Sequence, residues 1–590
     1  MATTTQSSTP PLPADLIEKI AKAHFLPGRP NERFGEHHTI KELLELNSRR
    51  YAQNTFLTYL AEDNSARTYT YEQFHLQALR IAAVLSQRMG LKRGDRIATA
   101  MHNHDLAILI AFAAWHLGIS IAPLNMGEED KRLAYVLHHS GAKVLFTLAE
   151  YAGRMREVCK SISNIQYFVC ADKPDAGFAI AEPREIDLAS LLLSADFAIV
   201  KIVQPLFEPE PDDEALVVYT SGTTGVPKGV AVSQYNLIAD AYAITRWHKM
   251  TPQTRLMCVL PVHHVNGLVV THVSPFYAGV SVVLNRKFSV HNFFGIIAKY
   301  GVHIASVVPT LLQFLLEATP KDLNVRTLAP SLRYLICGAG PLTVELAARF
   351  EERFGIPICH GYGLSESTCY SCFMPLARDA ADAEHKHWMR EHGFPSIGNA
   401  VETNEMAVHD ESGQEMAEGA KGEIVIRGHN IMLGYHDNLT ANAAAFTHGW
   451  FRSGDEGFYK TGSDGKRYFF ISGRFKELII RGGVKISPLE IDEVLNRIAG
   501  VKAAMAVGFD NATYGEEVGA YVVLQPGAQL SAESILCACH SKLPFWMSPK
   551  VVIFGDTFPV TSTGKYMRSQ LRPLFGAWRE VQFKPNADRA

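Results

Sequence analysis

The sequence is poor in cysteine, with nine in 590 residues, an odd number. Small secreted proteins that rely on disulfides are cysteine-dense, so this chain is not a disulfide scaffold. A CxxC at Cys369–Cys372 and a CxC at Cys537–Cys539 stand without a second pair at zinc-binding spacing, which argues against a zinc site. We therefore expect a reduced, intracellular protein located in the cytoplasm.

The sequence also has no excess of charge. Charged residues make up 20% of the chain and the formal net charge is −3, so no broad basic field attracts nucleic acid or anionic lipid. The first residues are polar and proline-rich, without the apolar core of a secretory signal or the arginines of a transit peptide. They predict a mobile tail over 1–35. The C-terminal PNADRA is not a peroxisomal address.

One long uncharged run, 106–124, has nearly the length of a membrane span. His116, Gly118 and Pro123 interrupt it, however. The run therefore predicts a buried helix that ends near Gly118, followed by a buried strand, and we expect no membrane span.

The chain is too long for one ordinary hydrophobic core, so several domains are expected. Apolar helical stretches alternate with short strand-like runs over 70–230 and again over 255–365, which is typical of a parallel α/β sheet. Short strands separated by Gly, Asp and Asn turns follow at about 398–472 and predict a small β-rich subdomain. We expect an α/β fold: a large N-terminal domain of parallel sheets over 1–475 that includes this subdomain, then a small mobile α+β domain over 476–590.

The stretch YTSGTTGVPKGV, 219–230, combines glycines, hydroxyl side chains and one lysine after an apolar run. Glycines let backbone N–H groups approach a ligand, successive amides form anion-binding nests, and a lysine adds a positive charge, so the stretch suits a polyphosphate. It is not a Walker A loop, because the lysine stands three residues after Gly225 and before another glycine. The expected ligands are Thr220, Ser221, Gly222, Thr223, Thr224, Gly225 and Lys228.

This stretch closely resembles the signature of the adenylate-forming superfamily, which contains acyl-CoA synthetases, amino-acid adenylation domains and firefly luciferases. Further motifs match in the family's order, so the resemblance spans about residues 55 to 570 and is greatest to an acyl-CoA ligase. The matching motifs are LPVHHVNGL from Leu260, LICGAGPL from Leu335, HGYGLSES from His360, FRSGDEG from Phe451, SGRFKELIIRGG from Ser472 and TGKYMR from Thr563.

The resemblance implies a nucleotide site. It assigns Tyr362 to stacking on adenine, and Glu366, together with Thr220, to magnesium. Asp455 and Arg474 take the places of the ribose-binding pair. Ser365 stands where many relatives have threonine, and the hydroxyl is retained. The other matching nucleotide-binding positions are Gly338, Ala339, Gly340, Gly361 and Gly363.

The resemblance also assigns the reacting groups. Lys565 matches the catalytic lysine that bridges the carboxylate and the α-phosphate, and His264 matches a histidine beside the acyl pocket. Lys476 matches the hinge of the C-terminal domain. The acyl-pocket positions are His263, Asn266 and Cys337, and the CoA path is Gly482, Gly483 and Lys485. His263 departs from the phenylalanine that is common at its position.

The implied reaction uses ATP, Mg²⁺ and CoA: a carboxylic acid becomes acyl-AMP with release of pyrophosphate, and a thiol then takes the acyl group. An acyl-AMP ligase that loads an acyl carrier protein is the alternative, although no extra segment lies between Arg474 and Ile486. An amino-acid-activating enzyme lacks its aspartate in HHVNG, and a luciferase lacks its lysine at Ile480. A catalytically dead scaffold protein would be expected to have lost its catalytic residues.

Two features concern the acid and the surface. Polar candidates in the pocket, among them Asn266 and Cys359, indicate a medium-sized or functionalised acid rather than a plain long-chain fatty acid. Residues 379–394 form a longer link than is usual in the family. The role of this link stays open between a partner contact and a pocket lid. The oligomeric state stays open, and a dimer is compatible with the sequence.

Overall fold

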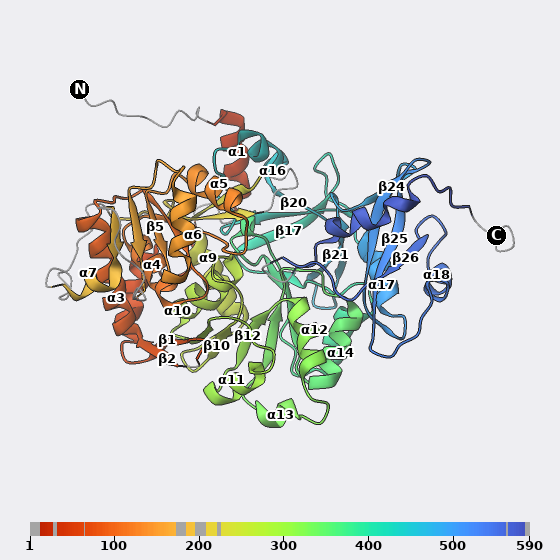
Figure 1. Cartoon of the computed structure of the whole chain (residues 1–590), viewed down its shortest axis with the longest axis horizontal. Coiled ribbons are helices and arrows are strands. Elements are labelled where there is room, and N and C mark those ends of the chain that lie inside the picture. The colour runs from red at the N-terminus through yellow and green to blue at the C-terminus, as the bar shows by residue number, and fades with distance from the viewer. Residues whose placement is uncertain are drawn as a thin grey trace.

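The computed structural model describes residues 12–26, 32–63, 65–172, 184–194, 208–220, 226–561 and 565–584. Figure 1 shows two sheet-containing layers on the N-terminal side, the strands β17, β20 and β21 in the middle, and a separate group of strands and helices at the C-terminal end. The predicted α/β fold class, with a large N-terminal part and a small C-terminal part, is confirmed.

The first large sheet has nine strands within the described residues, and its central strands run parallel. Parallel strands need crossover helices, which explains the alternating sequence pattern. In spatial order the strands are β16 (Asn399–Ala400), β15 (Cys372–Phe373), β14 (Ile358–Tyr362), β13 (Tyr334–Cys337), β12 (Ile304–Val307), β10 (Arg255–Cys258), β11 (Ser281–Asn285), β1 (Thr55–Leu60) and β2 (Ala66–Thr70).

The second large sheet has eight strands within the same ranges, again parallel in the middle. One edge turns antiparallel, where β9 pairs with β8 and β19 pairs with β9. The order is β19 (Gly434–Tyr435), β9 (Lys228–Ser233), β8 (Glu214–Thr220), β4 (Ser120–Pro123), β3 (Arg96–Ala100), β5 (Val144–Thr147), β6 (Tyr167–Cys170) and β7 (Glu185–Asp187).

Helices cover and separate these sheets, and one of them is formed by the long uncharged run at 106–124. The run forms α4 (Asp105–His116), which is buried almost throughout, and then the buried strand β4, as predicted. None of the helices in the described residues is long and apolar enough to cross a membrane. The other helices of the N-terminal part are α1 (Ala14–Ala23), α2 (Ile40–Arg50), α3 (Tyr71–Ala83), η1 (Val84–Arg88), α5 (Asp130–Ser140), α6 (Ala149–Cys159), α7 (Leu188–Leu193), α9 (Gln234–Trp247), η2 (Asn266–Val273), α10 (Ser274–Ala278), α11 (Phe293–Tyr300), α12 (Pro309–Ala318), α13 (Val325–Leu328), α14 (Val344–Phe354), η3 (Ser365–Ser367), α15 (Ala383–Arg390), α16 (Leu439–Ala445) and η4 (Thr447–Gly449).

The β-rich part and the C-terminal part each contain an antiparallel sheet. The first joins β17 (Asn404–His409), β18 (Gly422–Gly428), β20 (Phe451–Thr461) and β21 (Arg467–Arg474). The second joins β22 (Ile479–Arg481), β23 (Val484–Ile486), β24 (Val501–Asn511) and β25 (Gly515–Leu524), with β26 (Val551–Phe554) parallel to β25, and carries α17 (Pro488–Asn496), α18 (Ala532–His540) and η5 (Arg568–Trp578).

The prediction of a mobile tail over 1–35 is wrong for the described part of that range. Helix α1 buries Leu16 and Ile20 against the β-rich part, and His24 Nε2 lies 2.9 Å from the carbonyl oxygen of Met432. The polar composition of the first residues hid the amphipathic spacing of α1, which provides one apolar face for packing. Residues 1–11 lie outside the described residues.

The long link at 379–394 contains the helix α15, which packs on the protein's own core. His385 and Arg390 pair with the buried Glu351 on α14. The Trp388 ring stacks on Tyr468 with centroids 3.7 Å apart and an interplanar angle of 2°. The segment therefore ties α14 to the β-rich sheet. This packing accounts for the segment's apolar residues without a partner or a lid.

Replacing Trp388 by alanine should lower the free energy of unfolding by about 3–5 kcal/mol, because a buried aromatic ring and its stacking partner lose their contacts. Thermal unfolding of Trp388→Ala measures the loss. Glu384→Ala, on the exposed side of the same helix, is the control and should change stability by less than about 0.5 kcal/mol. Equal melting curves for the two variants would contradict this account of the segment.

Candidate functional site

The predicted site residues gather at the carboxyl ends of strands in the nine-stranded sheet, beside the β-rich sheet. Open α/β sheets bind ligands at this edge, because loops follow the carboxyl end of each parallel strand. Tyr362 ends β14, Gly338 follows β13, and His264 lies in the loop after β10. Asp455 comes from β20.

Asp455 connects the predicted adenine and ribose residues. The Tyr362 hydroxyl donates to Asp455 Oδ2 at 2.7 Å, and Arg474 Nε donates to Oδ1 at 2.6 Å. Asp455 is buried, and its charge raises the pKa of Arg474. Burial, together with Asp455, raises the pKa of Tyr362. A carboxylate with two oxygens suits a ribose and an aromatic ring held by a hydrogen bond suits a purine, so the geometry is compatible with the predicted roles, which stay predictions.

Glu366, the predicted magnesium ligand, is held by a residue that sequence reasoning missed. Tyr435 Oη donates to Glu366 Oε1 at 2.9 Å. The ring of the same tyrosine faces Lys228, whose Nζ lies 4.7 Å from the ring centroid. Burial lowers the pKa of Lys228, with Lys476 acting in the same direction and Glu366 opposing it. The groups predicted to meet the phosphates and the metal thus lie together.

Two antiparallel strands flank the predicted phosphate loop. Thr220 ends β8 and pairs across the hairpin with Lys228, which begins β9, so the hydroxyl and the ammonium group enter the loop from facing strands. The predicted ligands Ser221, Gly222, Thr223, Thr224 and Gly225 lie outside the described residues and stay predictions.

The turns at 338–340 and 361–363 need their small residues. Ala339 has a φ of +63°, a left-handed conformation that is uncommon for a residue with a side chain. A Cβ atom at Gly363 would lie 1.9 Å from the Cys369 carbonyl oxygen, and one at Gly361 would lie 2.5 Å from the Phe373 ring. Backbone and aromatic groups therefore approach Gly361 and Gly363 too closely for a side chain at either position. Gly340 shares the first turn, and Ser365 begins η3 beside Glu366.

Lys565 comes from the C-terminal part and lies within electrostatic reach of the site. Its side chain remains in contact with solvent, yet enough protein surrounds it that burial lowers its pKa to about 8, and Arg474 adds to this effect while Asp455 and Glu366 oppose it. Burial also lowers the pKa of His264, with Lys565 contributing, so this imidazole is neutral at pH 7. The ammonium group of Lys565 is thus close enough to act electrostatically on a neutral imidazole.

Asn266, a predicted acyl-pocket residue, belongs to a polar network that includes two residues that sequence reasoning missed. Ser306 Oγ donates to Asn266 Oδ1 at 2.7 Å, and Asn266 Nδ2 donates to Tyr370 Oη at 3.0 Å. All three side chains are buried. A Cβ atom at Gly338 would lie 2.5 Å from Tyr370 Oη, so the Tyr370 ring fills the space between the ends of β13 and β14.

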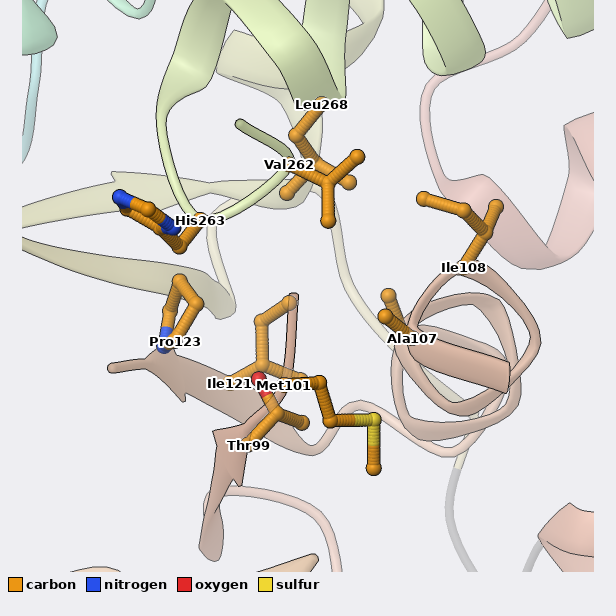
Figure 2. Close-up of a pocket in the computed structure, with 10 residues that line it drawn as sticks. Thr99, Met101, Ala107, Ile108, Ile121, Pro123, Val262, His263 and Leu268 are labelled. Atoms are coloured by element: carbon orange, nitrogen blue, oxygen red, sulfur yellow. The ribbon is translucent and has the colours of Figure 1, made fainter. Parts of the chain in front are cut away.

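The other two acyl-pocket predictions fare differently. His263 lines an apolar pocket with residues of β3, β4 and α4, and Figure 2 shows its ring beside Pro123 and across from Ile108. Burial lowers the pKa of His263 to about 4. Cys337 has no exposed surface and packs in the apolar core with residues of β12 and β13, and its place in the acyl pocket stays a prediction.

The predicted hinge and CoA residues lie where the chain enters the C-terminal part. Lys476 is exposed and follows the end of β21. Gly482 and Gly483 have φ values of +55° and +86° in the turn between β22 and β23, which glycine adopts without strain. Lys485 Nζ lies 3.6 Å from Glu411. Their roles stay predictions.

Side chains of the C-terminal part also contact the N-terminal part in this arrangement. Glu493, on α17, accepts a hydrogen bond at 3.0 Å from the backbone N–H of Val344, at the first turn of α14. Burial raises the pKa of Glu493 to about 8. Lys502 Nζ lies 3.0 Å from Glu317. These contacts hold Lys565 toward the N-terminal site.

The residues present fit Mg²⁺ together with a nucleotide. No group of three or more His, Cys, Asp or Glu side chains within the described ranges forms a metal cage. Mg²⁺ in nucleotide enzymes needs only one or two protein carboxylates, because phosphates and water supply its other ligands. Glu366 offers such a carboxylate beside Lys228. The nine cysteines, all within the described ranges, form no disulfide.

Comparison with known proteins supports this assembly. A profile of the AMP-binding enzyme family matches residues 44–436, and that of the AMP-binding enzyme C-terminal domain matches residues 490–565. The chain is 34% identical to a sulfoacetate–CoA ligase of Cupriavidus necator over 82% of this chain and 88% of the relative. It is 32% identical to an oxalate–CoA ligase of Arabidopsis thaliana over 90% of this chain and 97% of the relative.

A solved structure gives the same picture. The o-succinylbenzoate coenzyme A synthetase of Bacillus subtilis, in complex with ATP and magnesium ion, superposes with a TM-score of 0.73 at 25% identity. The alignment covers 90% of this chain and 98% of that one.

Replacing Lys565 by alanine should slow the formation of acyl-AMP by about 100-fold or more, because two anions then meet without the cation between them. Pyrophosphate release measures this half-reaction. Transfer of the acyl group from added acyl-AMP to CoA should stay within about threefold of wild type. Equal losses in both halves would contradict a role for Lys565 in adenylation alone.

The pH dependence of adenylation should show the lowered pKa of Lys565. Because the ammonium form is the useful one, kcat/KM should fall tenfold per pH unit above about pH 8, as the free enzyme loses this proton. Bound phosphates stabilise the ammonium, so kcat should fall only at higher pH. In Lys565→Arg the alkaline limb should disappear from the accessible range. A limb unchanged by this substitution would assign the ionisation to another group.

Proposed function

The chain belongs to the AMP-binding enzyme family and is an ATP-dependent carboxylic acid–CoA ligase, and we propose that its acid is short and carries a second polar group. The observation that carries this proposal is the buried hydrogen-bonded network of Asn266, Ser306 and Tyr370, which we take as the polar floor of the acid site. A long alkyl chain would have to displace the Tyr370 ring and leave these buried polar groups without partners, which is unfavourable.

The floor also offers donors to a ligand. The Tyr370 hydroxyl accepts from Asn266 and keeps its own proton to donate, and an amide nitrogen has a second N–H. Burial keeps His264 and His263 neutral at pH 7, since it lowers the pKa of each. The site is therefore suited to a hydrogen-bonding group, such as a hydroxyl, a carbonyl, a sulfonate or a second carboxyl oxygen.

In the proposed adenylation, the carboxylate of the acid approaches the α-phosphate while Lys565 lies between the two anions. No general base is needed, because a carboxylic acid is already ionised near pH 7. Lys228 meets the outer phosphates, and Asp455 and Arg474 bind the ribose. Mg²⁺, when bound at Glu366, neutralises phosphate charge.

The thiol step requires the C-terminal part to turn about Lys476. Lys565 then leaves the site, and the contacts of Glu493 and Lys502 with the N-terminal part break. The hairpin with Gly482 and Gly483 replaces it beside the thiol path. Such domain rotations let one site serve two reactions in sequence.

The named relatives support the acid class. Sulfoacetate and oxalate, the acids in the names of the two relatives above, are both short and both carry a second acidic group. The described floor has no arginine or lysine in its network, so a hydrogen-bonding rather than a strictly anionic second group is proposed here.

The acceptor and the setting of the reaction remain proposals in their finer detail. CoA is the acceptor, with an acyl carrier protein as the alternative. We also propose a cytoplasmic location, with which the few, unpaired cysteines are compatible. The oligomeric state stays open.

The test is a panel of acids supplied with ATP, Mg²⁺ and CoA, with AMP and acyl-CoA followed by mass spectrometry. Short acids with a hydroxyl, keto, sulfonate or second carboxyl group should give kcat/KM at least about tenfold above unsubstituted acids of equal length, because the unmatched floor is left without partners. Equal turnover of palmitate would contradict the proposal. Acyl-AMP that accumulates without acyl-CoA would favour the carrier protein.

Two variants separate polarity from length. Tyr370→Phe keeps the ring and removes the hydroxyl, so it should lower the preference for polar acids without admitting longer ones. Tyr370→Ala removes the ring and should extend the accepted chain length. If both variants keep the wild-type profile, the acid lies elsewhere, for instance in the apolar pocket beside His263 (Figure 2).

A further inference from the structure

Tyr435 stands at the edge of the eight-stranded sheet, directly beside the strand that carries Lys228. Strand β19 pairs with β9, so that Tyr435 lies opposite Val230, two residues after Lys228. The Asn442 side chain accepts from the backbone N–H of Tyr435 at 2.6 Å and donates to its carbonyl oxygen at 2.9 Å. Both backbone polar groups of Tyr435 are thus fixed, and the side chain projects from a rigid base.

The hydroxyl group of Tyr435 binds one carboxylate oxygen of Glu366, the predicted magnesium ligand. Tyr435 Oη donates to Glu366 Oε1 at 2.9 Å. Hydrogen bonds to an ionised acceptor are among the stronger ones. The phenol is the donor in this bond, because a carboxylate can only accept. This bond therefore fixes the orientation of the Glu366 carboxylate.

The aromatic ring of Tyr435 contacts Lys228, the lysine predicted to bind the phosphates. Lys228 Nζ lies 4.7 Å from the ring centroid, within the range of a cation–π interaction. The ring supplies this attraction without a negative charge that would compete with a phosphate. A lysine held by a carboxylate instead would be partly neutralised before its substrate arrives.

The backbone adds a third link between the same segments. The N–H of Met432 donates to the carbonyl oxygen of Glu366 at 2.9 Å, three residues before Tyr435. The segment 432–435 therefore contacts both the backbone and the side chain of Glu366, and it pairs with the strand of Lys228. The Tyr435 side chain thus contacts both Glu366 and Lys228.

We propose that Tyr435 is the positioning residue that sets the Mg²⁺ affinity of the ATP site, by orienting the Glu366 carboxylate through its hydroxyl and Lys228 through its ring. This assignment rests on the proposed roles of Glu366 and Lys228 but not on the identity of the acid. The two functions of the side chain are separable, because one belongs to the oxygen and the other to the ring.

ATP binding measured by calorimetry over a series of Mg²⁺ concentrations tests the assignment without any acid. In Tyr435→Phe the Mg²⁺ concentration for half-maximal ATP affinity should rise about tenfold, since partners of metal ligands typically affect metal affinity by this order. Saturating Mg²⁺ should restore the ATP affinity to within about twofold of wild type. Tyr435→Leu, which also loses the ring, should not be restored by Mg²⁺.

A matched control is Tyr459→Phe, a tyrosine of the β-rich sheet whose ring also lies beneath a cation, Arg467, at 4.6 Å. It should leave the Mg²⁺ dependence unchanged. The double variant Glu366→Gln with Tyr435→Phe should be no worse than Glu366→Gln alone, because the hydroxyl then has no carboxylate to orient. This comparison holds even where the single variant is less stable.

The outcomes are distinct. A loss of ATP affinity in Tyr435→Phe that is the same at every Mg²⁺ concentration, or no loss at all, overturns the assignment alone. Wild-type protein that binds no ATP in the presence of Mg²⁺ overturns the nucleotide site and this assignment together. A failed acid panel with normal Mg²⁺-dependent ATP binding affects only the proposed acid.

Discussion

A single buried carboxylate, that of Asp455, holds the parts of the site together. Its two oxygens bind Tyr362 from the nine-stranded sheet and Arg474 from the last residue of β21. A buried carboxylate needs such partners, because the loss of hydration is costly without them. The nine-stranded sheet, the β-rich sheet and the segment just before the predicted hinge are therefore connected through this one carboxylate. The same oxygens are those expected to bind the ribose hydroxyls, so the apo contacts hold the geometry that a nucleotide needs.

Much of this could be read from the sequence, for reasons that differ between features. The alternating apolar runs predicted the parallel sheets, and α4 could be told from a membrane span because Gly118 and Pro123 interrupt the run. Tyr362, Glu366, Asp455, Arg474 and Lys565 could be named because they stand in motifs with fixed spacing. Helix α1 was missed because the polar, proline-rich residues before it drew attention away from its short amphipathic pattern.

Other residues of the site could not be found in this way, because their roles arise only from contacts across the fold. Ser306 has no sequence signal of a role, because it is one serine in the apolar strand β12, and only the fold shows that it contacts Asn266. Tyr435 follows a glycine in an unremarkable stretch, and nothing local indicates that it reaches Glu366. Cys337 illustrates the converse: its motif could be recognised, but the motif did not show that its side chain is fully buried in an apolar cluster. A motif fixes where the backbone goes and leaves open which face a side chain takes.

The cap that Glu493 places on Val344 has a consequence for communication within the protein. Helix α14 begins only four residues after Gly340, and Gly340 belongs to the turn that is expected to contact adenine. Thr343 caps α14 from within the N-terminal part and Glu493 adds a second acceptor, so the proposed rotation of the C-terminal part would remove the Glu493 bond and leave the Thr343 cap in place. The turn expected to bind the base and the C-terminal part proposed to move are thus joined through the first turn of α14, so nucleotide release would be coupled to the domain rotation.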